Sequence, residues 1–112
     1  MARLLVIDDD EAVRRSLARV LAGAGYETAT AASTAEGRGT LATGCVDLLI
    51  CDVRMPDETG LDLIASLHRE QGSPPVLMIS GEDDPLVAEV AIEHGAYGYL
   101  VKPFDNRELL IN

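Results

Sequence analysis

The sequence predicts an open, doubly wound α/β domain built on a parallel sheet. Five short apolar runs alternate with segments in which apolar residues recur at helical spacing, so that a strand and a helix follow each other five times. Three of the runs are almost continuously apolar, which is typical of strands covered on both faces. Right-handed crossovers between such strands place helices on both faces of the sheet.

The five expected strands differ in polarity. The second is the most polar of them, which indicates a place at the edge of the sheet, whereas the first, third and fourth are expected to be buried. The expected strands are Leu4–Ile7, Tyr26–Thr30, Asp47–Cys51, Pro75–Ile79 and Tyr97–Val101.

Each strand is followed by an expected helix. Glycines follow the apolar stripes of the first, third and fourth helices, at Gly23 and Gly25, at Gly72 and at Gly95. The second helix, Ala35–Thr43, contains two glycines, which lower its helix propensity. The stripes consist of Val13, Leu17, Val20 and Leu21, of Leu61, Ile64, Leu67 and His68, and of Leu86, Val87, Val90, Ala91 and His94.

The fifth helix begins near Asp105 and reaches the last residue, Asn112. It is therefore expected to be truncated. On this interpretation residues 1–112 are one domain, and any effector domain lies outside them.

Charge, cysteine content and hydropathy exclude several classes of protein. The net charge of −10 argues against direct nucleic-acid binding, which depends on clustered Lys and Arg. Cys45 and Cys51 match no zinc or redox spacing and are expected as reduced thiols. The N-terminus has no signal-peptide pattern, and no apolar stretch approaches the ~20 residues that span a membrane. These features predict a cytoplasmic protein that does not contact membranes.

Polar residues at the strand ends are expected to meet, because the carboxyl ends of parallel strands share one edge of the sheet. Any one of them could be a helix cap, which is also an interpretation of Asp10, or a turn residue or a solvated charge. Together they indicate a site with three carboxylates, one hydroxyl and one ammonium group. They are Asp8 and Asp9 after the first strand, Asp52 after the third, Ser80 after the fourth and Lys102 after the fifth.

Three carboxylates at one edge need a counter-charge. At ~5 Å and an effective dielectric constant of ~20, each pair repels by ~3 kcal/mol. A hard divalent cation offsets this repulsion, which predicts an Mg²⁺ site, with Mn²⁺ as an alternative ion. Asp52 can then act as a nucleophile that forms an aspartyl phosphate. Lys102, the Ser80 hydroxyl and a backbone N–H near Gly81 would neutralise the phosphoryl oxygens.

The motifs at these strand ends resemble those of the receiver domain of bacterial two-component response regulators, and the resemblance covers essentially the whole chain. The motifs are specific in combination. They are Ile7-Asp8-Asp9, Asp52-Val53-Arg54-Met55-Pro56 with Gly60, Ser80-Gly81, and Tyr99-Leu100-Val101-Lys102-Pro103-Phe104.

The resemblance implies a flavodoxin-like fold with the strand order 2-1-3-4-5, and it implies roles for the acidic residues. Asp52 corresponds to the phosphoacceptor. Asp9 corresponds to a direct metal ligand, and Asp8 to a carboxylate that orients a metal-bound water. The backbone carbonyl of Arg54 corresponds to a further metal ligand.

The resemblance also implies the parts of a switch. Ser80 corresponds to the hydroxyl that follows phosphorylation, although threonine is commoner there in the family. Tyr99 corresponds to the aromatic residue whose rotamer responds to it. Lys102 corresponds to the phosphate-binding lysine, and Pro103 to a proline that follows a cis peptide bond.

The implied function is signal transduction. Asp52 would accept a phosphoryl group from the phosphohistidine of a histidine kinase or a histidine phosphotransfer protein. The domain would not be a conventional enzyme but would catalyse its own Mg²⁺-dependent phosphorylation and dephosphorylation. Further implied partners are a downstream effector domain or protein and a second copy of the chain in a phosphorylation-dependent homodimer.

Three other interpretations fit parts of the pattern. A haloacid-dehalogenase-like phosphatase also uses an aspartyl phosphate, and Asp8-Asp9-Asp10 contains its Asp-x-Asp pattern, but the chain lacks room for a cap domain and the acidic pair after the lysine. A phosphorylation-independent interaction module would share the fold. A flavodoxin-like carrier would need a Ser/Thr/Gly-rich phosphate loop after the first strand, which the sequence does not contain.

Two charged residues are expected at the mouth of the site. Arg54 lies two positions after Asp52, and Glu82 lies two positions after Ser80. Both could be solvated loop charges. The alternative hypothesis is that they pair across the mouth and slow the entry of the water that hydrolyses the aspartyl phosphate.

Overall fold

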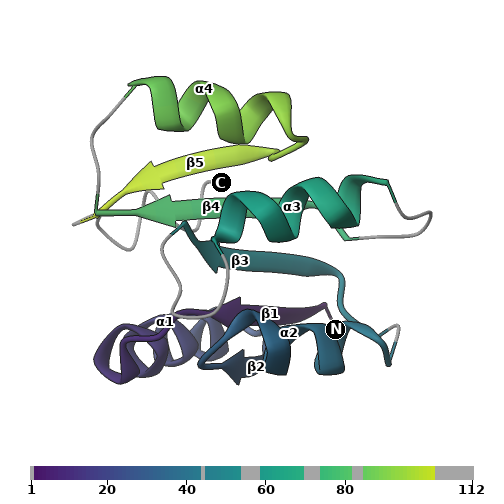
Figure 1. The fold of residues 1–112 in the computed structure, drawn as a ribbon. Coiled ribbons are helices and arrows are strands. Elements are labelled where there is room, and N and C mark those ends of the chain that lie inside the picture. Colours follow the sequence, from purple (N-terminus) through teal and green to yellow (C-terminus); the bar gives the residue numbers. More distant parts are fainter. Residues whose placement is uncertain (1, 44, 54–58, 70–73, 82–84, 103–112) are drawn as a thin grey trace.

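The structure is a computed structural model that describes residues 2–43, 45–53, 59–69, 74–81 and 85–102. The side chains of His68 and of residues 85–87 are outside this description. Strands and helices alternate along the described chain (Figure 1). The elements are β1 (Arg3–Ile7), α1 (Glu11–Gly23), β2 (Glu27–Ala31), α2 (Thr34–Leu41), β3 (Leu48–Asp52), α3 (Gly60–His68), β4 (Val76–Ser80), α4 (Pro85–Glu93) and β5 (Gly98–Val101).

The five strands form one parallel sheet in the order β2-β1-β3-β4-β5. This order and the doubly wound architecture confirm the predicted fold class. The polar second strand lies at an edge, as predicted. The central strands β1, β3 and β4 are buried along almost their whole length.

Side chains of the strands alternate between two apolar layers. One layer packs against α1, through Leu17 and Leu21. The other packs against α3 and α4, and Leu41 of α2 lies against it. Figure 1 shows α2 and α3 crossing in front of the strands. The described helices therefore cover both faces of the sheet.

Three strands, β2, β3 and β4, end one residue later than predicted, and the last residues of β3 and β4 belong to the candidate site. Asp52 pairs with Ile79, and Ser80 pairs with Val101, so both are the last residues of their strands. The prediction ended β3 and β4 at their last apolar side chains. The hydrogen bonds between strands are formed by backbone groups, which do not depend on side-chain polarity. Asp52 and Ser80 are consequently held by the sheet itself rather than by loops.

The described helices follow the predicted pattern, with differences in the bounds of α2 and α3 and in the buried face of α3. Asp10 caps α1, because its side chain accepts hydrogen bonds from the amides of Ala12 and Val13. In α3 the buried stripe includes Leu63, whereas Leu61, which the predicted stripe contained, is only partly buried. α3 ends at His68, ahead of the predicted stop at Gly72. The fifth expected helix lies outside the described residues.

Cys51 is buried and Cys45 is exposed, and both are free thiols as predicted. Among the described residues, no helix is long and apolar enough to cross a membrane.

Candidate functional site

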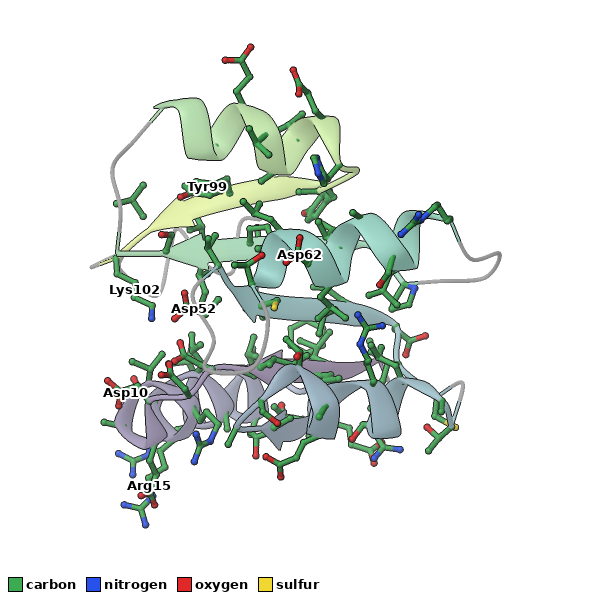
Figure 2. The ribbon with its side chains drawn as sticks, in the orientation of Figure 1. Asp10, Arg15, Asp52, Asp62, Tyr99 and Lys102 are labelled. Carbon is green, nitrogen blue, oxygen red and sulfur yellow. The ribbon has the colours of Figure 1, made fainter. Side chains whose placement is uncertain are left out.

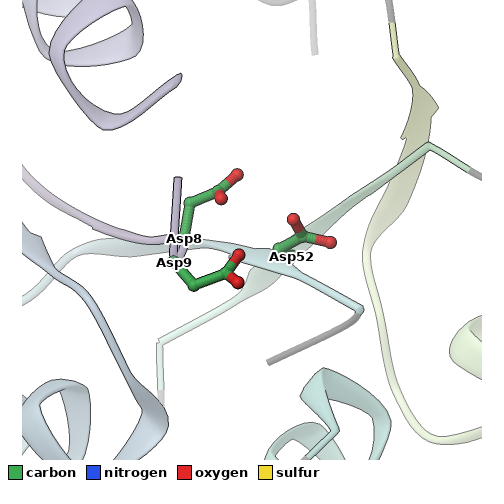
Figure 3. Close-up of side chains that lie close together, drawn as sticks. All are labelled: Asp8, Asp9 and Asp52. Carbon is green, nitrogen blue, oxygen red and sulfur yellow. The ribbon is translucent and has the colours of Figure 1, made fainter. Parts of the chain in front are cut away.

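Three carboxylates gather at the carboxyl edge of the sheet. One carboxylate oxygen each of Asp8, Asp9 and Asp52 lies within 4.8 Å of the other two. Figure 3 shows the three side chains side by side at the ends of β1 and β3. Asp8 is fully buried and Asp52 is 7% exposed, whereas Asp9 is exposed to solvent. The cluster is thus open on the side of Asp9.

Among the described residues, Lys102 is the positively charged residue that pairs with these carboxylates. Its Nζ atom donates to Asp8 Oδ2 and to Asp52 Oδ2, each at 2.9 Å. Figure 2 shows Lys102 and Asp52 on the same side of the molecule as Asp10, where the strands end. Burial disfavours the charged form of Lys102. The hydrogen bonds to Asp52 and Asp8 and the attraction of both carboxylates outweigh burial and raise the pKa of Lys102 above 10.5. Lys102 therefore stays an ammonium group at neutral pH.

The charge balance of the cluster fits a divalent cation. Among the described residues, three carboxylates share one ammonium group, Lys102, so that negative side-chain charges outnumber the positive charge bonded to them by two. Two of the three carboxylates are buried, so solvent screens their repulsion weakly. Oxygen ligands from carboxylates, with an open side for water, are what Mg²⁺ prefers. Asp8, Asp9 and Asp52 could therefore hold such an ion.

The backbone around Asp8 is fixed by three hydrogen bonds. The Asp8 N–H donates to the carbonyl of Ala31 at 3.1 Å, which extends the β1–β2 pairing past the end of β1. Asp8 Oδ1 accepts from the Asp10 N–H at 2.9 Å, an arrangement typical of an Asp in a tight turn. The Asp8 carbonyl accepts from Arg14 Nη1 at 2.8 Å. This turn leads directly into α1.

The backbone after Asp52 is fixed by β4 and by the start of α3. The Val53 N–H donates to the carbonyl of Ile79 at 3.0 Å, and the Val53 carbonyl accepts from the Gly60 N–H at 2.7 Å. Gly60 lies against the backbone carbonyl of Asp52, and a Cβ atom at this position would collide with that oxygen and approach Met78 Cε to 2.8 Å. The first residue of α3 must therefore be glycine for the helix to reach Asp52 this closely.

Ser80 ends β4, the strand that pairs with β3, and Tyr99 lies on β5 at the edge of the sheet. Ser80 is 1% exposed, and its carbonyl accepts from the Lys102 N–H at 2.6 Å, so that β4 fixes the backbone of Lys102. Tyr99 is partly buried on β5 and packs against the apolar layer that faces α3 (Figure 2). Their predicted switch roles stay predictions.

Three of the predicted site residues, Arg54, Glu82 and Pro103, lie outside the described residues. The hydrogen bond between Lys102 and Asp8 was not predicted from the sequence. Its only signal in the sequence is that both residues directly follow strands, which gives no distance between them. Arg14 was also not predicted to contact the site.

Mg²⁺ is expected to stabilise the folded domain, because only the folded chain brings the three carboxylates together. At a concentration a hundredfold above its dissociation constant, the ion would add ~2.7 kcal/mol to the free energy of unfolding. For a domain of this size the melting temperature would rise by roughly 10 °C. Thermal melts with and without MgCl₂, with NaCl at matched ionic strength as control, measure the effect. Equal melting temperatures in the two salts would rule out the metal site.

The fold and the acidic cluster define a doubly wound α/β domain with a carboxylate site at the carboxyl edge of its sheet, and the comparisons with known proteins give its family. The model of the response regulator receiver domain family matches residues 4–112. The chain therefore belongs to the response regulator receiver domains of two-component signalling. This membership excludes the haloacid-dehalogenase-like and carrier alternatives.

Similar proteins include transcriptional regulators and single receiver domains. The DNA-binding transcriptional regulator NtrC of Azospirillum brasilense is 40% identical over 109 residues, which are 97% of this chain and 23% of that protein. The crystal structure of CheY4 of Vibrio cholerae has a TM-score of 0.92 and 34% identity, with 99% of this chain and 94% of that chain covered. The beryllofluoride-activated NtrC4 receiver domain dimer has a TM-score of 0.92 and 32% identity, with 99% and 92% covered. The chain spans about a quarter of the length of the NtrC protein it matches.

Proposed function

We propose that this chain is the phosphoacceptor domain of a longer response regulator and that Asp52 is the residue phosphorylated. The observation that carries this proposal is the position of Asp52, whose carboxylate lies within 4.8 Å of the Asp8 and Asp9 carboxylates and accepts a hydrogen bond from the Lys102 ammonium group. The donor would be the phosphohistidine of a histidine kinase or of a histidine phosphotransfer protein.

In the transfer step, a carboxylate oxygen of Asp52 forms a bond to phosphorus. The bond from phosphorus to the histidine nitrogen breaks at the same time, and its electron pair stays on the imidazole of the donor. Attack by water on the phosphorus later returns Asp52 to the free carboxylate and releases phosphate. The sheet holds Asp52 in place for this step, because pairing with Ile79 and the contact with Gly60 fix its backbone.

Lys102 would neutralise the charge that builds up on the phosphoryl oxygens. An ammonium group has three N–H donors, and among the described residues two of these are used by Asp8 and Asp52. The third can donate to a phosphoryl oxygen. The raised pKa favours the charged form of this group.

Asp8, Asp9 and Asp52, with the backbone carbonyl of Arg54, would hold Mg²⁺ or Mn²⁺. When bound, the ion supplies positive charge next to the phosphoryl oxygens and lowers the repulsion between them and the carboxylates. The backbone hydrogen bonds of Asp8 and Val53 support this assignment, because they would hold Asp8 and Asp52 at this edge of the sheet whether or not an ion is bound.

Phosphorylation would be transmitted through Ser80 and Tyr99. The Ser80 hydroxyl would turn toward the new phosphoryl group, and Tyr99 would turn inward and change the surface formed by α4 and β5. That surface would act on an output domain or on a second copy of the chain. The receiver dimer of NtrC4, which is named as beryllofluoride-activated, is consistent with a phosphorylation-dependent homodimer.

The test is the intact mass of the protein after incubation with a small phosphodonor, such as acetyl phosphate, and MgCl₂. A retained gain of one phosphoryl group, absent when EDTA replaces MgCl₂, is the expected result. No gain under any condition would show a phosphorylation-independent interaction module. Phosphate release through many turnovers without a retained group would show a phosphatase.

A further inference from the structure

Arg14 lies in the first turn of α1, where a cation is not expected. The Arg14 N–H makes an early hydrogen bond of the helix, to the Asp10 carbonyl at 3.0 Å. The N-terminal end of a helix carries partial positive charge and favours acidic side chains. The Arg14 side chain nevertheless reaches back past this end of α1, and its Nη1 atom donates to the Asp8 carbonyl at 2.8 Å. A residue that breaks a local preference in this way points to a function elsewhere.

Among the described residues, no acidic side chain forms a salt bridge with the half-buried Arg14. The hydrogen bond of its guanidinium group goes to the backbone of Asp8. The neighbouring Arg15 differs in this respect. Its side chain is 77% exposed and lies 3.7 Å from Glu11, one helical turn away. The two arginines therefore carry the same charge on the same helix in different environments.

The carbonyl that Arg14 holds belongs to the peptide group between Asp8 and Asp9. Asp8 itself has further anchors, through its N–H, its Oδ1 and its Oδ2 atoms. Asp9 lacks such anchors. Its side chain is exposed, and its carboxylate forms no hydrogen bond with the described part of the chain. The orientation of the Asp8–Asp9 peptide group sets the direction in which the Asp9 side chain leaves the backbone. Asp9 nevertheless lies within the cluster of three carboxylates.

We infer that Arg14 is a positioning residue for the metal site: by holding the Asp8 carbonyl, it directs the Asp9 carboxylate toward Asp8 and Asp52. This inference rests on the metal site of the proposed function. It concerns the affinity of the site for Mg²⁺, and it assigns no contact between Arg14 and the phosphoryl group.

Positioning and charge make opposite predictions for Arg14→Gln. Loss of a nearby positive charge alone would tighten Mg²⁺ binding, because the cluster repels the cation less. Loss of positioning would weaken it, since partners that orient metal ligands typically contribute about 10- to 100-fold to metal affinity. We expect the dissociation constant for Mg²⁺, measured by isothermal titration calorimetry, to rise by about 10-fold or more in Arg14→Gln.

Arg15→Gln is the matched control, because it removes the same charge from the same helix without a contact to the site. Its dissociation constant should stay within about twofold of the wild-type value. Arg14→Lys keeps the positive charge and an N–H donor group, and it should bind Mg²⁺ more tightly than Arg14→Gln but less tightly than the wild type. If the glutamine variant does not fold, the lysine variant carries the test, with an expected loss of affinity despite the unchanged charge.

A double-mutant cycle with Asp9→Asn separates positioning of Asp9 from a general effect on the fold. If Arg14 acts through Asp9, Arg14→Gln should change the affinity little, by about twofold or less, once Asp9 is replaced. An Arg14→Gln variant that binds Mg²⁺ as tightly as the wild type, or more tightly, would overturn the inference while leaving the proposed function in place. A wild-type protein that binds no Mg²⁺ would overturn both.

Discussion

Asp52→Asn is expected to abolish phosphoryl acceptance while leaving the metal-free domain at least as stable as the wild-type domain. Among the described residues, the substitution removes an attraction to Lys102 and repulsions to Asp8 and Asp9. Lys102 keeps its hydrogen bond to Asp8. The two lost repulsions, each across at most 4.8 Å, are expected to offset the lost attraction across 2.9 Å, so that the free energy of unfolding should stay unchanged or rise by about 1 kcal/mol.

Intact mass spectrometry with a phosphodonor and urea denaturation without metal measure the two effects. Asp62→Asn is a suitable control, because Asp62 is an exposed carboxylate in the first turn of α3 (Figure 2). It should keep both phosphorylation and stability close to the wild-type values. A structural role for Asp52 predicts the opposite sign, so a clearly destabilised Asp52→Asn variant would contradict the assignment.

Gly60→Ala is expected to impair both folding stability and phosphoryl transfer. The new Cβ atom would collide with the Asp52 backbone carbonyl, which cannot move aside as a flexible side chain could. α3 would have to shift away from Asp52, at a cost of about 1–3 kcal/mol or more in the free energy of unfolding. A displacement of about 1 Å at a reacting group can lower its rate by about 100-fold.

Gly39→Ala in α2 serves as the control for this substitution. No atom lies within 4 Å of a Cβ at position 39, so the change should stabilise the helix by about 0.5–1 kcal/mol and leave phosphorylation unchanged. Urea denaturation and the rate of phosphorylation by acetyl phosphate measure both variants. Wild-type values for Gly60→Ala would show that α3 does not hold the backbone of Asp52.

The parallel sheet and the proximity of the carboxylates could be predicted from the sequence. Both follow from where the apolar runs begin and end along the chain. Apolar runs mark buried parallel strands, and the rule that their carboxyl ends share an edge brings Asp8 and Asp52 together. The predicted order β2-β1-β3-β4-β5 is confirmed. Close contacts could not be predicted in the same way. The hydrogen bond of Arg14 to the Asp8 carbonyl depends on backbone direction, which the order of residues does not give.

The stripe of α3 shows why a helical face can be misjudged. Leu61 and Leu63 are two positions apart and therefore lie about 200° apart around the helix, so they cannot both face the sheet. Each fits a stripe with Ile64 and Leu67. The contact of Gly60 with the backbone of Asp52 fixes how α3 lies on the sheet, and Leu63 is the residue that becomes buried. That contact is tertiary, and local spacing contains no information on it.

The separation of Lys102 from its partners along the chain has a consequence for protein synthesis. Lys102 is 94 positions from Asp8 and 50 from Asp52. On the ribosome, a nascent chain that ends before residue 102 lacks the ammonium group that pairs with Asp8 and Asp52. It also lacks part or all of β5, the strand that pairs with β4. The arrangement of charges around Asp52 is therefore completed only when β5 joins the sheet. A fragment released before Lys102 is added would contain Asp52 but not the ammonium group beside it.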